Sequence, residues 1–187
     1  MPRPNRTRYT VLGALTHGPM SGYDIKKFIE GTTNNFWRES YGQIYPTLKQ
    51  LTAEGLVTRS RVQQEGKPDR YVYTLADEGR EELREWLLEP AESEVPRVEL
   101  LLKLFFGHQI SVDANLRHVE RHATDIQRGL EHLRGIDAML SAKHGEHPAI
   151  PYSLLVLRQG ILIHEALERW CHEARETLIG LGASASE

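Results

Sequence analysis

The feature that most constrains the fold of this chain is a change of hydrophobic spacing at Gly55. Before it, apolar residues recur three and four positions apart, which is the spacing of one face of a helix. After it, residues 57–63 alternate between two sets as in a β-strand, with Val57, Arg59 and Arg61 in one set. The chain is therefore predicted to be mainly α-helical with a small β-hairpin.

Three short helices are predicted in the N-terminal part. The first spans residues 7–16 and ends at residues 17–19, His-Gly-Pro, because proline cannot continue a helix. Ser21 precedes the second amphipathic stretch as an N-cap, and Asp24 three positions later gives a capping-box-like start. The third helix spans residues 40–54, and a glycine closes it.

The third helix carries polar side chains of the kind that read DNA. Ser40 is its N-cap candidate, and Ile44, Leu48 and Leu51 point inward at spacings of four and three. A glutamine on such a helix can make a bidentate pair with adenine, and a lysine can donate to guanine or phosphate. Ordinary solvent exposure would explain each polar residue singly, but their occurrence together favours DNA. The residues on the other faces are Tyr41, Gln43, Tyr45, Lys49 and Gln50.

A hairpin follows, with predicted strands over residues 57–63 and 70–75 joined by a turn over residues 65–69. A fourth helix is predicted over residues 77–88. Three helices, a hairpin with a basic tip and a fourth helix describe a winged helix-turn-helix. In that fold the third helix enters the major groove and the wing lies along the DNA backbone. The apolar face of the fourth helix holds Leu83, Trp86 and Leu87.

Charge is divided unevenly along the chain. Residues 1–75 hold 11 Lys and Arg against 6 Asp and Glu, a balance of +5, whereas residues 76–187 hold 12 against 20, a balance of −8. A basic part on an acidic remainder is expected when only one part of a protein touches phosphate. In the basic part, Lys67 and Arg70 belong to the wing, and the Ser21-Gly22 helix start offers backbone N–H groups to a phosphate.

These segments together resemble the PadR family of bacterial transcriptional regulators over most of residues 9–107. The N-terminal matches are Leu12-Gly13, Gly18-Pro19-Met20-Ser21-Gly22-Tyr23-Asp24-Ile25 and Phe36-Trp37. Later matches are Ser40-Tyr41-Gly42-Gln43-Ile44-Tyr45-Pro46, Glu54-Gly55-Leu56-Val57, Gly66-Lys67-Pro68, Arg70, Tyr73 and Gly79. Residues 100–107, Leu-Leu-Leu-Lys-Leu-Phe-Phe-Gly, are similar to the linker of the long, Vir-like subgroup.

The resemblance implies a dimeric DNA-binding repressor that a small phenolic or drug-like aromatic effector releases from DNA. Where the family usually has Thr or Ser before the fourth helix, this chain has Ala76, so Asp77 is expected to cap that helix. The DNA contacts implied by position are Ser21, Gly22, Ser40, Tyr41, Gln43, Tyr45, Lys49, Lys67 and Arg70.

The C-terminal part is predicted to be helical. A proline-bracketed linker over residues 90–96 precedes a short apolar helix over residues 99–106. From Val112 to Leu133, apolar residues follow one another at alternating steps of four and three, a heptad seam that favours lengthwise packing on another helix. The last helix is predicted over residues 154–181.

Two long amphipathic helices and a short one do not easily close a core alone, which predicts a symmetric homodimer. A dimer also meets the need for two recognition helices about 34 Å apart on a pseudo-palindromic operator. We expect residues 1–90 to form the DNA-binding domain and residues 91–187 the dimerisation and effector domain. The predicted dimerisation residues are Leu116, Val119, Ile126, Leu130, Leu133, Ile161 and Leu178.

Aromatic and metal-binding side chains offer further hypotheses. Trp37, Trp86 and Trp170 could line an aromatic effector pocket, although ordinary core packing is the more frequent role of tryptophan. His118 with His122, and the row of His164, Glu168 and His172 beside Cys171, have spacings that could hold a transition metal. Solvated or interface positions are the more frequent role, so no metal is predicted.

An enzyme and a protein-interaction module are the alternatives to a DNA-binding regulator. Cys171 and His172 are consecutive helical residues, which do not face each other, and no phosphate loop, dinucleotide fingerprint or nucleophile elbow occurs. We therefore expect no enzyme and no cofactor. A winged helix used only for protein contacts would lack salt-dependent DNA binding.

Location follows from composition. No apolar run approaches the roughly 20 residues that span a bilayer, so no membrane is expected as a partner. The one cysteine, Cys171, cannot form an intrachain disulfide, which favours a cytoplasmic setting.

Overall fold

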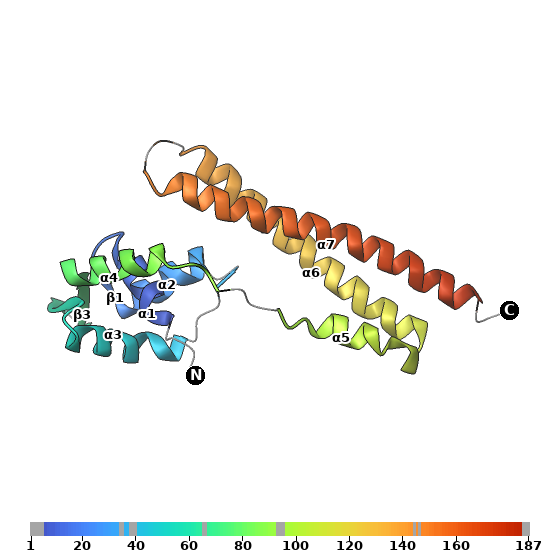
Figure 1. The fold of residues 1–187 in the computed structure, drawn as a ribbon, viewed down its shortest axis with the longest axis horizontal. Coiled ribbons are helices and arrows are strands. Elements are labelled where there is room, and N and C mark those ends of the chain that lie inside the picture. Colours follow the sequence, from blue (N-terminus) through green and yellow to red (C-terminus); the bar gives the residue numbers. More distant parts are fainter. Residues whose placement is uncertain are drawn as a thin grey trace. The chain divides into compact units, whose positions relative to one another are not determined.

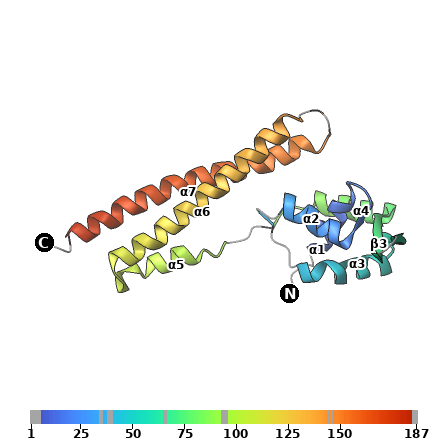
Figure 2. The same ribbon diagram turned by 180° about the vertical axis from the view of Figure 1, so that it is seen from behind.

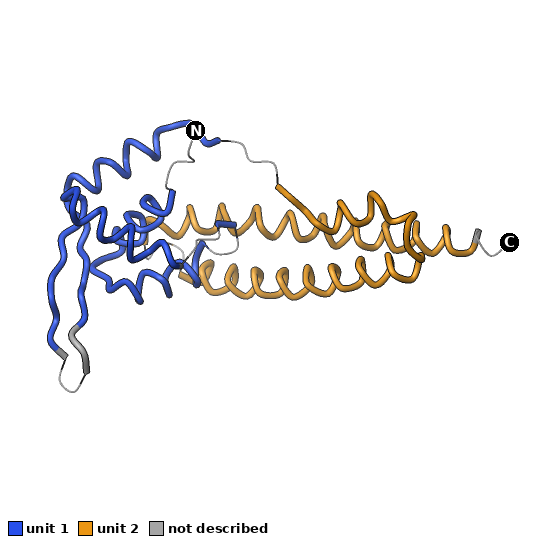
Figure 3. The backbone as a smooth tube through the Cα atoms, turned by 90° about the horizontal axis from the view of Figure 1, so that it is seen from below, with its two compact units in different colours: residues 1–93 blue, residues 94–187 orange. Residues whose placement is uncertain are grey.

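The computed structural model describes residues 6–33, 36–37, 41–64, 67–92, 96–143, 145 and 147–184. It divides the chain into two compact units, Met1–Ser93 and Glu94–Glu187, which we call unit 1 and unit 2 (Figure 3). The division lies close to the boundary expected after residue 90.

Unit 1 consists of four helices and a small sheet (Figures 1 and 2). Helix α1 packs against α2, α3 and α4. The mainly helical winged architecture expected from the sequence is thereby confirmed. The elements in chain order are α1 (Thr7–Leu15), β1 (Met20–Ser21), α2 (Gly22–Thr32), a 3₁₀ turn (Tyr41–Gln43), α3 (Ile44–Ala53), β2 (Val57–Gln64), β3 (Lys67–Leu75) and α4 (Asp77–Leu88).

The core of unit 1 takes apolar side chains from all four helices and from the sheet. Val11 and Leu12 of α1 are fully buried. The predicted inward face of α3 is confirmed, because Ile44, Leu48 and Leu51 are at most 1% exposed. On α4, by contrast, Leu83 is buried but Leu87 is 65% exposed, so the apolar face predicted to hold Leu83, Trp86 and Leu87 does not bury Leu87.

The sheet has three strands in the order β1-β3-β2, one more than the predicted hairpin. Strand β1 pairs antiparallel with β3, with Met20 opposite Tyr73 and Ser21 opposite Val72. Strand β3 begins at Lys67, so residues 67–69 continue the strand and do not form part of the turn that the sequence suggested. The hairpin of β2 and β3 extends away from the helices of unit 1 (Figure 3).

Helix ends in unit 1 follow local chemistry. Gly55, at φ 78°, ends α3, and the Leu56 N–H donates to the Leu51 carbonyl at 2.9 Å, as in a Schellman motif. Helix α3 begins at Ile44, and Pro46 is tolerated at its third position because an N–H there would have no acceptor within the helix. The predicted cap Ser40 lies outside the described residues.

The start of α4 differs from the prediction. Ala76 is the N-cap residue and no side chain caps it, so the capping role expected for Asp77 is wrong. Asp77 is instead the first helical residue, and its carboxylate with that of Glu78 lies in the first turn, where negative charge complements the helix dipole.

Unit 2 contains α5 (Glu99–Phe105), a 3₁₀ turn (Gly107–Gln109), α6 (Val112–Ser141) and α7 (Ile150–Ser184). Helices α6 and α7 lie side by side and antiparallel in both views (Figures 1 and 2). Helix α7 begins earlier than predicted, because proline is tolerated in a first turn, here at Pro151. Within the described part of the chain, no helix combines the length and apolarity needed to cross a membrane.

Gly79 lies where α4 meets the backbone of Leu56. A Cβ at residue 79 would lie 2.1 Å from the Leu56 carbonyl oxygen, which also accepts the Ala76 N–H at 3.1 Å. We expect Gly79→Ala to lower the free energy of unfolding by about 1–3 kcal/mol, the usual effect of overpacking. Urea unfolding measures the change. Gly13→Ala in α1, where nothing lies within 4 Å of the new methyl group, is the control. Equal loss in both variants would contradict the steric argument.

Candidate nucleic-acid interface

Helix α3 presents a polar face opposite its buried one. Tyr45 and Lys49 of this helix are exposed, as is Gln43 in the 3₁₀ turn just before it, and Tyr45 is 61% accessible. Tyr45 and Lys49 are four residues apart, so they share one side of the helix. Of the remaining predicted DNA contacts near this helix, Ser40 lies outside the described residues, and for Tyr41 only the backbone is described.

The side chain of Tyr45 lies against the start of α2. A Cβ added at Gly22 would lie 2.6 Å from the Tyr45 Cε1 atom, so the ring occupies the space that any other residue at position 22 would fill. The first N–H groups of a helix lack intrahelical acceptors and attract anions. The structure thus brings Tyr45 of α3 beside the Ser21-Gly22 helix start, two features that the sequence named separately.

The start of α2 is held by a reciprocal capping box, as predicted. The Ser21 Oγ accepts the Asp24 N–H at 3.2 Å, and the Asp24 carboxylate accepts the Ser21 N–H at 3.0 Å. The Ser21 hydroxyl also donates to that carboxylate at 2.7 Å. From strand β3, the Arg70 Nη1 lies 3.8 Å from the Asp24 Oδ2, which places the wing residue beside the helix start.

These contacts shift the acidity of Asp24. The hydrogen bonds from the Ser21 side chain and backbone hold the pKa of the Asp24 carboxyl below its ordinary value, and the positive charges of Arg70 and Lys27 act in the same direction. The folded form of unit 1 therefore favours the ionised carboxylate.

The wing contains two cations that sequence reasoning did not assign to DNA. Arg59 and Arg61 of β2 are exposed, and the Arg59 guanidinium lies 4.3 Å from the ring centre of Tyr71. Tyr71 is paired in register with Arg61. The alternation of β2 already placed both arginines on one face, so it was the available signal for them. The side chain of Lys67, the predicted wing cation, is outside the described residues.

Each of the three tryptophans contacts a different partner. Trp86 stacks on Tyr9 with ring centres 4.4 Å apart and planes 4° from parallel. The Arg6 guanidinium lies 5.7 Å from the Trp37 ring centre. In unit 2, Trp170 meets His122 edge to face at 6.3 Å. These contacts fit packing roles, and effector binding by the three residues stays a prediction.

The histidine rows of unit 2 have other partners. His164 Nδ1 lies 2.8 Å from the Gly160 carbonyl oxygen, and His172 pairs with Glu176 at 3.3 Å. Burial raises the pKa of the Cys171 thiol, which disfavours the thiolate that binds metals. Among the residues described, no three His, Cys, Asp or Glu side chains gather as a metal site would require.

Five of the predicted dimerisation residues are buried within a single chain. Leu130, Leu133 and Ile161 form a core between α6 and α7, at 3–4% exposure. Val119 and Ile126 are also buried, whereas Leu116 and Leu178 are half-buried. These five side chains are therefore buried within one chain, and their role in dimerisation stays a prediction.

A groove of about 460 Å³ lies between α6 and α7. Val119, Ala123 and Cys171 contribute apolar surface to it, and charged side chains such as Arg169 and Glu173 also line it.

Two family models match this chain. The one described as the transcriptional regulator PadR-like family matches residues 11–85, and the one described as virulence activator alpha C-term matches residues 96–178.

Two relatives are similar in sequence. The negative transcriptional regulator PadR of Bacillus subtilis is 39% identical over 100 residues, covering 53% of this chain. In that alignment the chain spans 55% of the relative's length, little more than half. A probable transcriptional regulator of Mycobacterium tuberculosis is 29% identical over 184 residues, covering 91% of this chain and 96% of that protein.

Solved structures of the Bacillus subtilis protein are similar over nearly the whole chain. Its complex with operator DNA has a TM-score of 0.80 at 28% identity, covering 92% of this chain and 98% of that chain. Its complex with p-coumaric acid has a TM-score of 0.74 at 27% identity, covering 95% and 98%.

The lowered pKa of Asp24 predicts a pH effect on stability. A carboxyl whose pKa is depressed on folding stabilises the native state above its unfolded pKa, and this stabilisation is lost as pH falls through the folded value. We expect Asp24→Asn to be less stable than the parent at neutral pH, with the difference shrinking below a pH of about 4. Thermal unfolding between neutral and acid pH measures it. A difference that does not change with pH would contradict a role for the charge.

Proposed function

Because this chain belongs to the PadR-like family of transcriptional regulators, we propose that it binds operator DNA and regulates transcription in a sequence-specific way. The observation that carries the proposal is the convergence of α3, the start of α2 and the wing on one cluster. There, Tyr45 lies against Gly22, and Arg70 lies beside Asp24.

The proposed contacts divide by chemistry. Lys49, on the exposed side of α3, and Gln43, in the 3₁₀ turn just before this helix, would reach base edges in the major groove. Phosphate contacts would come from the start of α2 and from hydroxyl and cationic side chains nearby. The phosphate-contacting set is Ser21, Gly22, Ser40, Tyr41, Tyr45, Lys67 and Arg70.

Repression and release by a phenolic effector form the finer part of the proposal. They are supported by a relative named as a negative regulator and by the structure of that relative with p-coumaric acid. Trp37, Trp86 and Trp170 are the aromatic side chains that we propose for the effector.

We further propose that the protein acts as a homodimer. Helix α5 has no buried residue, and Leu101, Leu102, Phe105 and Phe106 are 51–78% exposed. A short helix with so much bare apolar surface is unstable alone, so a partner must cover it. We assign that surface to a second copy of the chain, since two half-sites require two recognition helices.

The DNA-binding proposal predicts the effect of Lys49→Ala. We expect affinity for a duplex that the wild-type protein selects from a random pool to fall about 5- to 100-fold, the range for losing one base or phosphate contact. Fluorescence anisotropy at several salt concentrations measures it. Lys143→Ala, which removes another exposed positive charge just after α6, is the control.

Other outcomes of that experiment are informative. Wild-type protein that binds no duplex even at low salt would contradict DNA binding and favour the protein-interaction module. Adding p-coumaric acid to the wild-type complex should lower the affinity, and an unchanged affinity would remove this compound as the effector.

The dimer proposal predicts the effect of Phe105→Glu. Phe105 is 78% exposed on α5, and a carboxylate there would be buried without a partner in a dimer. Size-exclusion chromatography with light scattering should show a dimer for the wild type and a monomer for the variant. Leu88→Glu on α4, at a residue 85% exposed, is the control. A monomeric wild type at micromolar concentration would contradict the dimer.

A further inference from the structure

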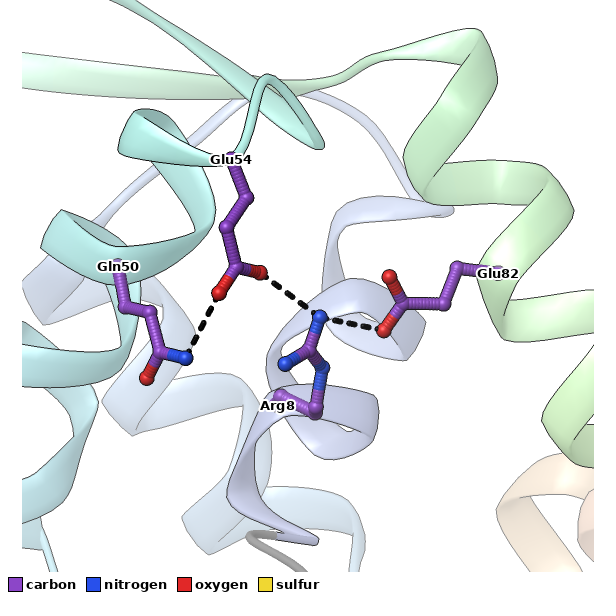
Figure 4. A network of polar contacts seen from close by, with 4 residues as sticks. All are labelled: Arg8, Gln50, Glu54 and Glu82. Atoms are coloured by element: carbon purple, nitrogen blue, oxygen red, sulfur yellow. Dashed lines mark hydrogen bonds and ion pairs between the residues drawn. The ribbon is translucent and has the colours of Figure 1, made fainter.

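One side chain of α1 joins the end of α3 to α4 (Figure 4). The Arg8 Nη2 lies 2.8 Å from the Glu54 Oε2 and 2.6 Å from the Glu82 Oε1. Glu54 is the C-cap residue of α3 and also accepts a hydrogen bond from the Gln50 side chain at 2.8 Å. Three helices that are distant in sequence therefore meet at a single nitrogen atom.

This cluster is shielded from solvent more than the surface ion pairs of unit 1. The side chains of Arg8, Glu82 and Glu54 are 21%, 28% and 37% exposed. In the neighbouring pair of Arg84 and Glu81, both side chains are more than 60% exposed. Partial burial reduces screening by salt, so the Arg8 contacts exert a stronger positional restraint than an exposed pair does.

The position of the cluster gives it influence over α3. At the N-terminal end of α3, Tyr45 lies against Gly22, and at the C-terminal end Glu54 is held by Arg8. The proposed base-reading residue Lys49 lies between these two attachments. A change at Glu54 therefore alters the direction in which Lys49 is presented without removing any DNA contact.

The same end of α1 is also fastened to α4 and to the segment after it. Tyr9, next to Arg8, stacks on Trp86 of α4. Arg6, two residues before Arg8, forms an ion pair with Glu92, beyond the end of α4. A displacement of α4 therefore acts on the α1 residues that hold α3.

We propose that Arg8 is a positioning residue for DNA recognition, which transmits the position of α4 to α3 through Glu82 and Glu54. The proposal rests on the proposed function, since it assigns a means of regulation to the same DNA-reading helix. If Arg8 acts in this way, operator recognition requires its contact with Glu82 as much as its contact with Glu54.

The sharpest test compares Arg8→Gln with Glu82→Gln. Both break the bridge, but the first removes a positive charge and the second a negative one. A general charge effect would weaken DNA binding in the first variant and strengthen it in the second. Positioning predicts that both bind the wild-type-selected duplex more weakly, by about five- to tenfold. The slope of affinity against salt should be unchanged in both, because neither residue touches phosphate.

Two further variants complete the experiment. Arg8→Lys should retain most of the affinity, because both carboxylates approach one nitrogen and the Arg8 Nε is buried without a hydrogen-bond partner in the described structure. Arg84→Gln, which removes the same charge from an exposed pair on α4, should bind like the wild type. The double variant Arg8→Gln with Glu82→Gln should lose no more affinity than either single variant.

The outcomes separate this proposal from the one on which it rests. Wild-type protein that selects no sequence would refute DNA recognition itself. Wild-type selection together with unchanged or stronger binding by Glu82→Gln would overturn the positioning role of Arg8. If Arg8→Gln fails to fold in a thermal unfolding control, Glu82→Gln decides the question, because it leaves the Arg8 contact with Glu54 in place.

Discussion

The rest of unit 1 depends on the burial of one side of α3. Ile44, Thr47, Leu48 and Leu51 are at most 2% exposed, and each apolar side chain so buried contributes about 1.5–3 kcal/mol. Helix α3 cannot move away from the core of unit 1 without exposing these side chains to water. Close-packed interiors respond to force by small shifts of whole elements and not by continuous deformation. Changes in what α3 presents to DNA must therefore come from contacts at its ends, where Gly22 and Arg8 meet it.

Unit 2 shows what a narrow apolar stripe achieves on its own. Glu120 of α6 pairs with Arg175 of α7, and Arg134 of α6 pairs with Glu165 of α7. The residue numbers rise along α6 and fall along α7, as antiparallel helices require. Gly129 and Gly160 have no side chains, so the two helices approach closely at His164 and Leu133. The apolar stripe of α6 is buried mainly by its packing against α7. The outer faces keep exposed apolar residues such as Tyr152 and Leu155, and a second copy would have these available.

Sequence reasoning succeeded where a residue's neighbours in the chain determine its surroundings. Helical spacing identified the buried face of α3, and the Ser21 capping box followed from residues three positions apart. It could not say which segment each strand or helix would pack against. A two-residue strand such as β1 has no period to detect, and a heptad seam does not say whether its partner is α7 or another chain. The proposed DNA-reading residues on α3 were therefore all named in advance, whereas the Arg8 cluster was not, because its members are distant in sequence.

The contact between Gly79 and the Leu56 carbonyl and the contacts of the Arg8 cluster restrain different parts of α4. Backbone atoms hold the first turn of α4 tightly, whereas the buried side chain of Leu83, the ion pair of Glu82 with Arg8 and the stack of Trp86 on Tyr9 hold the rest of that helix. A rod fixed tightly at one end and elastically along its length pivots about the fixed end. Helix α4 is then a lever whose far end is at Leu88, and the ion pair of Arg6 with Glu92 restrains the chain just beyond that end. Glu82 is three residues from Gly79 and six from Leu88, so a displacement at Leu88 would be smaller at Glu82, which would make the contact with Arg8 a fine adjustment and not a coarse one.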